Sequence, residues 1–173
     1  ELPVKSAQEL AEEIPFFEAM PVSQDIETLL KHDLFYLLVY GMNRKDMDND
    51  WLFERCREVQ ETPDNRLDLW AREHYKSTII TIGLTIQNVL RNPDITVGIF
   101  SHTRPIAKAF LRQIKREWET NILLQTYFPF IAPPKKSEAR TRTWSEDSGL
   151  IVRRGGNPKE ATIEAWGLVD GQP

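Results

Sequence analysis

The residues that most directly suggest chemistry are Lys76, Ser77 and Thr78, which follow a short apolar segment and precede a longer apolar run. This order predicts a short strand over 66–70, a tight loop, and a helix over 76–90. In a phosphate-binding loop, backbone N–H groups and a helix N-terminus contact phosphate oxygens, a lysine adds positive charge, and a hydroxyl binds Mg²⁺. The segment therefore favours nucleotide binding.

The loop departs from the usual form of such a site, which has a glycine at its start and another before the lysine. Here Ala71 opens the loop and Tyr75 precedes Lys76. Glycine suits these positions because it adopts positive φ and lets the backbone approach the ligand. Tyr75 must therefore turn its ring outward or follow a less strained path. The alternative is an ordinary helix start, with Ser77 or Thr78 near the cap and a solvated lysine.

The wider sequence resembles the ATPase domain of the large terminase subunit of tailed bacteriophages, the motor that packages DNA into proheads. The resemblance extends from about residue 25 to the end, and it is carried by the segments 51–60, 67–78, 95–115 and 160–173. Terminases are known for phosphate loops with an arginine early and Lys-Ser or Lys-Thr at the end. The segment from Ala71-Arg72 to Lys76-Ser77 fits that form.

The resemblance implies a role for each part of the loop. Lys76 would bind the β- and γ-phosphate oxygens of ATP, and Ser77 would bind Mg²⁺. Arg72 would stabilise charge on the γ-phosphate in the transition state, as proposed for the early loop arginine of terminases; the alternative is a structural ion pair. The nucleotide-binding residues would be Ala71, Arg72, Glu73, His74, Tyr75, Lys76, Ser77 and Thr78, with Lys76 and Arg72 catalytic.

An ATPase of this type also needs an acidic pair at the end of a later apolar strand. The sequence contains no four apolar residues followed by Asp-Asp or Asp-Glu. In terminases this strand follows the region that 160–173 matches, and the nuclease domain lies beyond it. We therefore expect the N-terminal part of an ATPase domain, truncated before the acidic strand, which hydrolyses ATP in the full-length protein and is inactive alone.

Two other interpretations remain open. One is a different P-loop nucleotide-binding protein, such as a nucleotide kinase or a helicase-like ATPase. The other is a non-enzymatic module whose degenerate loop is empty. For a terminase, the implied partners are double-stranded DNA, the portal protein and the small terminase subunit, and the implied assembly is a homo-oligomeric ring. The implied location is the host cytoplasm, with transient docking on the prohead.

Composition limits these readings further. A chain of 173 residues with 40% hydrophobic residues is sufficient for one domain. It contains no apolar run of the length that spans a bilayer, so we expect no membrane partner. Cys56 is the single cysteine, which excludes an internal disulfide, and a small semi-buried side chain is the expected role. The net charge of −4 argues against a dedicated basic nucleic-acid-binding domain.

Strands and helices alternate after residue 60, which predicts an α/β fold with a P-loop NTPase-type parallel sheet core. We expect a helical region over 1–60 packed on a core over 61–173 that ends in a β-hairpin, the whole being an incomplete domain. The expected helices begin at Ser6 and Ser23, follow an N-cap at Asp50, and cover 103–121. The expected strands are 95–101, buried on both faces, then 140–144, 149–154 and 161–166.

Several residues outside the loop are further candidates. Ser101 and His102 follow a strand and could approach the site, although Ser101 or Thr103 could simply cap the next helix. Gln60 lies upstream of the loop, in the position of an adenine-reading glutamine; the alternative is a solvated helix-end residue. Arg153 and Arg154 are candidate basic contacts or exposed hairpin charges.

The helix over 103–121 has two distinct faces. An apolar face is expected to be buried, and a basic face could contact DNA phosphates or be an ordinary solvated surface. The apolar face consists of Ile106, Phe110, Ile114 and Trp118, and the basic face of Arg104, Lys108, Arg112, Lys115 and Arg116.

Overall fold

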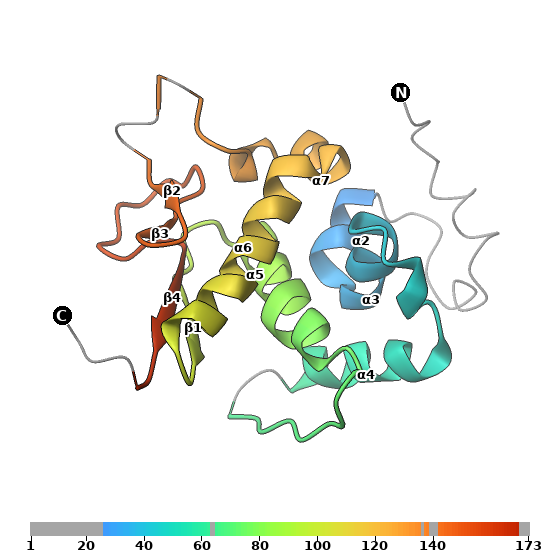
Figure 1. Ribbon diagram of the computed structural model, residues 1–173. Coiled ribbons are helices and arrows are strands. Elements are labelled where there is room, and N and C mark those ends of the chain that lie inside the picture. The colour runs from blue at the N-terminus through green and yellow to red at the C-terminus, as the bar shows by residue number, and fades with distance from the viewer. Residues whose placement is uncertain (1–25, 63–64, 136, 139–141, 170–173) are drawn as a thin grey trace.

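The computed structural model describes residues 26–62, 65–135, 137–138 and 142–169. The sheet lies at one end of the molecule, two long helices cross its middle, and the N-terminal helices form the other end (Figure 1). One continuous hydrophobic core joins these parts, from Leu29 to Ala165. The helix that we expect to begin at Ser6 lies outside the described residues.

The N-terminal helices follow the apolar pattern of 26–41. They are α2 (Ile26–His32), α3 (Leu34–Tyr36) and the π-helix η2 (Leu37–Gly41). The helical region is interrupted at Asp33, whose backbone is extended and whose carboxylate accepts a hydrogen bond from Tyr36 N. This cap satisfies an N–H group that helix geometry leaves without a partner.

The 3-10 helix η3 (Lys45–Met47) and the helix α4 (Asp50–Glu61) follow. The residue that caps α4 is Asn49 rather than Asp50, because the Asn49 side chain accepts the Leu52 N–H at 3.0 Å. The expected helix over 51–60 is therefore present, and its cap lies one residue earlier than predicted.

The helix predicted over 76–90 is present as two contiguous parts, η4 (Ser77–Leu84) and α5 (Thr85–Arg91). η4 is a π-helix, in which the backbone hydrogen bonds close wider turns. It packs against α3 and α4, while α5 packs against α2. Gly83 allows η4 to approach η2 closely, because a Cβ there would lie 2.8 Å from Leu38 Cδ2.

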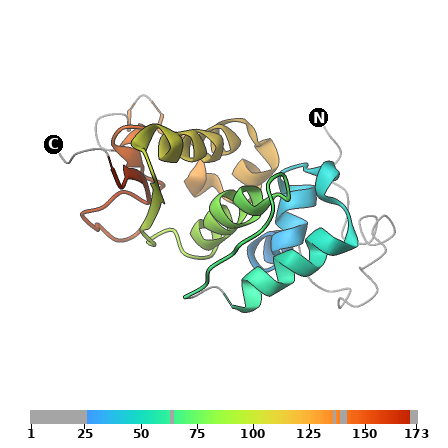
Figure 2. The same cartoon turned by 60° about the horizontal axis from the view of Figure 1, so that its bottom comes forward.

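The long helix α6 (Arg104–Thr120) is followed by α7 (Ile122–Tyr127) and the 3-10 helix η5 (Pro129–Ile131). Figure 2 shows α6 and α4 on opposite sides of η4 and α5. The buried face of α6 consists of Ala107, Leu111, Ile114 and Trp118. The predicted face is thus wrong at Ile106, which is 47% exposed, because the helix turns the neighbouring row of apolar residues toward the sheet.

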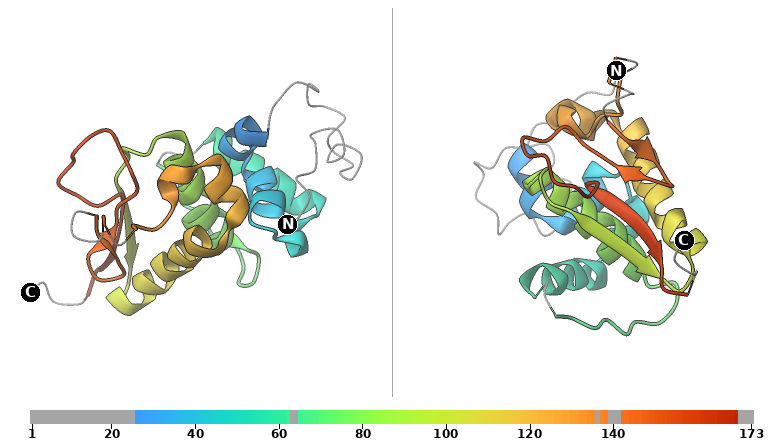
Figure 3. Two further views of the ribbon diagram at one scale, coloured as in Figure 1. Left: turned by 90° about the horizontal axis from the view of Figure 1, so that it is seen from above. Right: turned by 90° about the vertical axis from the view of Figure 1, so that its left-hand side faces the viewer.

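The four strands form one mixed sheet in the order β1-β4-β3-β2. They are β1 (Val97–Ser101), β2 (Trp144–Ser145), β3 (Gly149–Leu150) and β4 (Ile163–Gly167). β1 and β4 are parallel, and β3 is antiparallel to both β2 and β4. Figure 3 shows β1 and β4 side by side as the longest strands. The α/β class is therefore confirmed, and β3 and β4 pair antiparallel as in the predicted hairpin, but the sheet is mixed where a parallel sheet core was predicted.

The strand β1 is buried on one face only, which corrects the expectation of two buried faces. Helix α6 contacts both β1 and β4 and covers Ile99 and Ala165. On the opposite face, Phe100 is 63% exposed and its register partner Trp166 is 40% exposed.

None of the helices in the described part of the chain is long and apolar enough to span a bilayer.

Candidate functional site

The segment before the loop is tied to α4 by charge. Arg66 donates to the Glu58 carboxylate at 2.6 Å, to the Glu58 carbonyl at 2.7 Å and to the Asp68 carboxylate at 2.8 Å. Arg66 is mostly buried, so these charge-assisted hydrogen bonds replace the water that its guanidinium loses. They fix the entry to the loop on the last turns of α4.

No strand forms over 66–70, so that prediction is wrong. Leu67 and Leu69 are 81% and 82% exposed, whereas Arg66, Asp68 and Trp70 are partly buried. This alternation is typical of extended backbone, but no neighbouring strand pairs with the segment in the described part of the chain. A strand needs a neighbouring strand to pair with its N–H and C=O groups. The β-propensity of its residues does not supply that neighbour.

The loop has the backbone conformation that glycine normally supplies. Glu73 has φ of 66° and Tyr75 has φ of 58°, both in the left-handed region. Residues other than glycine adopt this region rarely, and each instance costs about 1–3 kcal/mol. Two of the four such residues in the described part of the chain thus lie within this short loop. Tyr75 directly precedes the lysine, where glycine is expected.

The ring of Tyr75 points away from the loop toward the N-terminal helices. The Arg44 guanidinium lies 5.6 Å from the ring centre. Hydrogen bonding to Asp46 raises the pKa of the Tyr75 hydroxyl. Of the two possibilities raised by the sequence, Tyr75 therefore adopts the outward ring, and its backbone remains in the strained region.

An aromatic contact from α4 covers one side of the loop. The Trp51 ring lies 5.9 Å from Trp70 and 5.5 Å from His74, both in edge-on arrangements. His74 Nδ1 also forms a hydrogen bond with the Arg72 carbonyl at 2.7 Å. Trp51 is not among the residues predicted for the site. The apolar spacing within α4 gave no signal of it, because the contact joins residues about twenty positions apart.

Lys76 and Ser77 lie at the junction of loop and helix, as predicted. The Lys76 ammonium lies 3.4 Å from the Asp68 carbonyl, where the chain enters the loop. Ser77 and Thr78 are half-buried at the start of η4, and Ile79 N donates to the Tyr75 carbonyl at 2.9 Å. The first N–H groups of this helix and one lysine charge thus converge at the end of the loop.

The Arg72 side chain is exposed and forms no hydrogen bond or ion pair with the residues that the structure describes, whereas the Arg72 carbonyl is bonded to His74. Within the described residues, the alternative of a structural ion pair is therefore not seen. Ala71, Glu73 and His74 are also exposed. The loop brings together all eight predicted residues because they are contiguous. Two of their rings contact other parts of the protein, His74 against Trp51 and Tyr75 against Arg44.

The other candidates from the sequence have structural partners. Gln60 Nε2 donates to the His32 carbonyl and to Gln87 Oε1, and Gln60 Oε1 accepts from Leu34 N. Gln60 thus links α4 to α2, α3 and α5 and is not a solvated helix-end residue. Cys56 is fully buried, rather than semi-buried, and burial raises its pKa to about 12. That environment keeps the thiol protonated.

The residues after β1 remain separate from the loop. The Ser101 and His102 carbonyls accept from Leu168 N and Val169 N, which extends the pairing of β1 with β4. Thr103 precedes α6 without a side-chain capping bond. Within the described residues, no hydrogen bond joins Ser101 or His102 to the loop.

Much of the basic face of α6 is paired rather than freely solvated. Arg104 donates to the Asp147 carbonyl, Lys108 pairs with the Asp147 carboxylate, and Arg112 pairs with Glu146 at 2.8 Å. These acids belong to the turn between β2 and β3. The basic face therefore holds this turn against the helix.

A magnesium ion at Ser77 would depend on ligands from the nucleotide. The described residues contain no group of three or more His, Cys, Asp or Glu side chains that could hold a metal ion. The Ser77 hydroxyl suits a magnesium ion that arrives with the phosphates, since Mg²⁺ retains water and phosphate ligands.

Comparison with protein-family models, curated proteins and solved structures finds no match to this chain.

Proposed function

We propose that this chain is the N-terminal part of the ATPase motor of a phage large terminase, and that residues 71–78 bind the phosphates of ATP. The observation that carries the proposal is the left-handed backbone of Tyr75 immediately before Lys76 and the helix from Ser77. Strained conformations persist where the surrounding structure holds them, and they concentrate at ligand sites.

The residues of the loop suit these roles chemically. The N–H groups at the start of η4 favour an anion, and Lys76 adds a full charge beside them. The exposed Arg72 guanidinium has no competing partner among the described residues, so it is free to contact a γ-phosphate. When bound, Mg²⁺ would neutralise phosphate charge, with Ser77 as its ligand from the protein.

The exposed leucines before the loop agree with a missing neighbour. Leu67 and Leu69 point to solvent from extended backbone. The resemblance implies an acidic strand after the region 160–173. Such a strand would pair with the backbone of 66–70 and supply the acidic pair, and hydrolysis would then need that strand as well as the loop.

Calorimetric titration of Mg-ATP into the 173-residue chain tests the proposal. Binding should be lost in Lys76→Ala and kept in Lys115→Ala, a matched change of a partly exposed lysine on α6. Circular dichroism of both variants checks that the fold is intact. Equal binding by the wild type and Lys76→Ala would contradict the proposed role of the loop.

One observation favours a second candidate, the non-enzymatic module with an empty loop. Tyr75 uses its side chain to join the loop to Arg44 and Asp46, which is a structural role. The same titration on a protein extended past Pro173 separates the two candidates. Absence of Mg-ATP binding in both the extended and the present chain would favour the empty module.

A further inference from the structure

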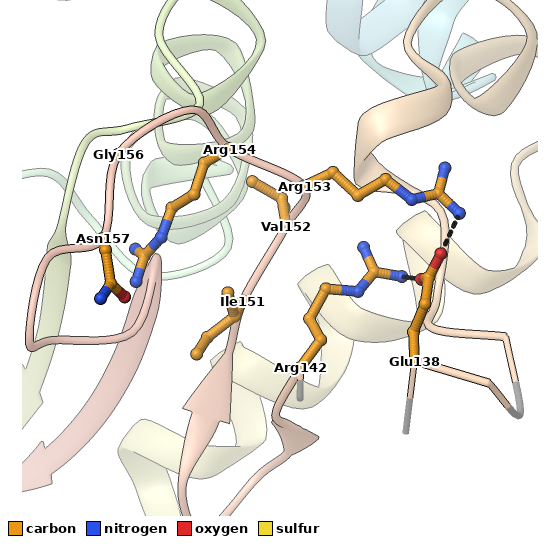
Figure 4. A pocket seen from close by; sticks show the side chains of 8 residues that line it. All are labelled: Glu138, Arg142, Ile151, Val152, Arg153, Arg154, Gly156 and Asn157. Carbon is orange, nitrogen blue, oxygen red and sulfur yellow. Dashed lines mark hydrogen bonds and ion pairs between the residues drawn. The ribbon is translucent and has the colours of Figure 1, made fainter. Parts of the chain in front are cut away.

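A second polar site lies at the other end of the molecule, beside the sheet. We call it the arginine pocket, a cavity of about 340 Å³ whose polar lining comes from Glu138, Arg142, Arg153, Arg154, Gly156 and Asn157. Figure 4 shows Arg142 and Arg153 converging on Glu138, while Arg154 extends on the other side, beside Asn157. The residues come from the segment before β2 and the connection between β3 and β4.

The pocket carries an excess of positive charge. Its lining has three arginines and one glutamate, which gives 3 − 1 = +2. Glu138 is shared, since its carboxylate pairs with Arg142 at 3.1 Å and with Arg153 at 3.1 Å. Although desolvation opposes it, the hydrogen bond from Arg153 and the two nearby guanidinium charges lower the pKa of Glu138. The carboxylate therefore stays ionised and still leaves two charges unbalanced.

Arg142 is the central group of the pocket, because it is only 8% exposed. Its Nη2 donates to the Ala132 carbonyl at 2.8 Å, but its Nε and Nη1 are buried without a partner among the described residues. Burial lowers the pKa of this guanidinium. A buried charged donor without a partner is costly, and an oxyanion in the pocket would remove that cost.

Arg154 presents a second donor in a fixed position. Its Nη2 donates to the Pro158 carbonyl at 3.1 Å and to the Glu160 carbonyl at 2.9 Å. Its Nη1 is buried without a partner among the described residues. The two backbone contacts hold the guanidinium in place, so binding a ligand through the remaining nitrogen would cost little side-chain entropy.

We propose that the arginine pocket binds a phosphate group, which accepts from Arg142 and balances the charges of Arg153 and Arg154. Guanidinium groups match phosphate oxygens in geometry and charge, and a dianion would neutralise the excess of +2. The phosphate could come from free phosphate or a phosphomonoester, or from a phosphodiester of DNA. The inference does not depend on the nucleotide-binding loop, which lies in a different part of the chain.

NMR titration with inorganic phosphate tests this site by following the Nε–H signal of Arg142. The titration uses the Lys76→Ala background, so that the loop does not contribute, and sodium chloride at matched ionic strength controls for screening. We expect a saturable shift with phosphate and none with chloride. Arg153→Gln should weaken binding about tenfold, because one of the positive charges that the phosphate balances is lost.

The matched control is Arg112→Gln, which removes another arginine paired with a single glutamate but outside the pocket. It should leave phosphate binding unchanged. A shift that does not saturate, or that chloride reproduces, would overturn the proposal, as would equal weakening by Arg112→Gln and Arg153→Gln. A short DNA duplex then identifies the source: displacement of phosphate indicates a phosphodiester ligand, and its absence indicates free phosphate or a monoester.

Discussion

The guanidinium of Arg44 lies 5.6 Å from the centre of the Tyr75 ring and also donates two hydrogen bonds to the Asp46 carboxylate, at 3.0 and 2.8 Å. The three residues thus connect η3 to the residue that precedes Lys76. This connection explains how a tyrosine can occupy a strained loop position. Its ring has a defined site on the N-terminal helices, and that packing offsets part of the backbone strain.

The same cluster makes stability depend on acid pH. The hydrogen bond from Arg44 lowers the pKa of Asp46 to about 2, with Tyr75 contributing in the same direction. The unfolded value is about 3.9, so this contribution is complete above that pH and is lost as the pH falls through about 2. We expect Asp46→Asn to flatten this part of the urea midpoint's pH dependence.

Asp48→Asn is the control for Asp46→Asn, because Asp48 is an exposed acid in the same connection. The test is to measure urea midpoints between pH 2 and pH 5 for the wild type and both variants. A similar flattening in both variants would contradict a specific role for Asp46.

Arg72→Ala should leave the fold and Mg-ATP binding in place. The Arg72 side chain is exposed and has no hydrogen-bonding partner among the described residues, so its removal breaks no side-chain contact, and the carbonyl bonded to His74 is kept. In a full-length protein, ATP turnover should nevertheless be lost, because the guanidinium is proposed to act on transition-state charge rather than on ground-state binding. Thermal unfolding, calorimetry and a phosphate-release assay measure the three properties, and an unfolded Arg72→Ala variant would refute this assignment.

Gly149→Ala should lower the free energy of unfolding by about 1–3 kcal/mol. Gly149 has φ of 86°, and a Cβ there would lie 2.6 Å from Ala161 Cβ and 2.7 Å from the Ile163 carbonyl oxygen. Gly155→Ala is the matched control, since the nearest atom to its Cβ would be Asp94 Oδ2 at 3.8 Å. Urea unfolding of both variants measures the difference. Equal losses in the free energy of unfolding would show that the backbone conformation and close contacts of Gly149 do not account for the destabilisation.

Asp33→Ala should lower the free energy of unfolding by about 2 kcal/mol. One carboxylate oxygen caps α3 at Tyr36 N, and the other accepts from Arg57 at 2.6 Å. Asp33 is buried but Arg57 is about one-third exposed, so water screens part of the pair. Asp48→Ala serves as the exposed control in urea unfolding. A loss no larger than that of the control would mean that the cap and the pair contribute little.

Local patterns predicted the helices well. The apolar spacing in 51–60, 76–90 and 103–121 is enough to locate α4, the helix formed by η4 and α5, and α6. The sequence could not determine which apolar row of α6 faces the sheet, because Ile106 and Ala107 both begin plausible rows. That choice depends on where β1 and β4 lie.

Longer-range features were not predictable in the same way. The segment 66–70 has the composition of a strand but lacks a neighbouring strand in the described part of the chain. The order of residues from Ala71 to Thr78 indicated the loop, whereas the contacts of Trp51 and Arg44 with it depend on tertiary packing. Arg142 gave no signal at all, because its burial arises only when 142, 153 and 154 come together.

The loop is held at its two ends by different forces. Ion pairs of Arg66 secure its entry, whereas the buried side chain of Ile79 secures its exit. Dissolved salt screens the ion pairs of Arg66 and strengthens the apolar burial of Ile79 only indirectly. Cooling weakens the apolar burial of Ile79 and leaves the ion pairs of Arg66 in place. Ionic strength and temperature therefore act separately on the two ends of the loop that holds Lys76.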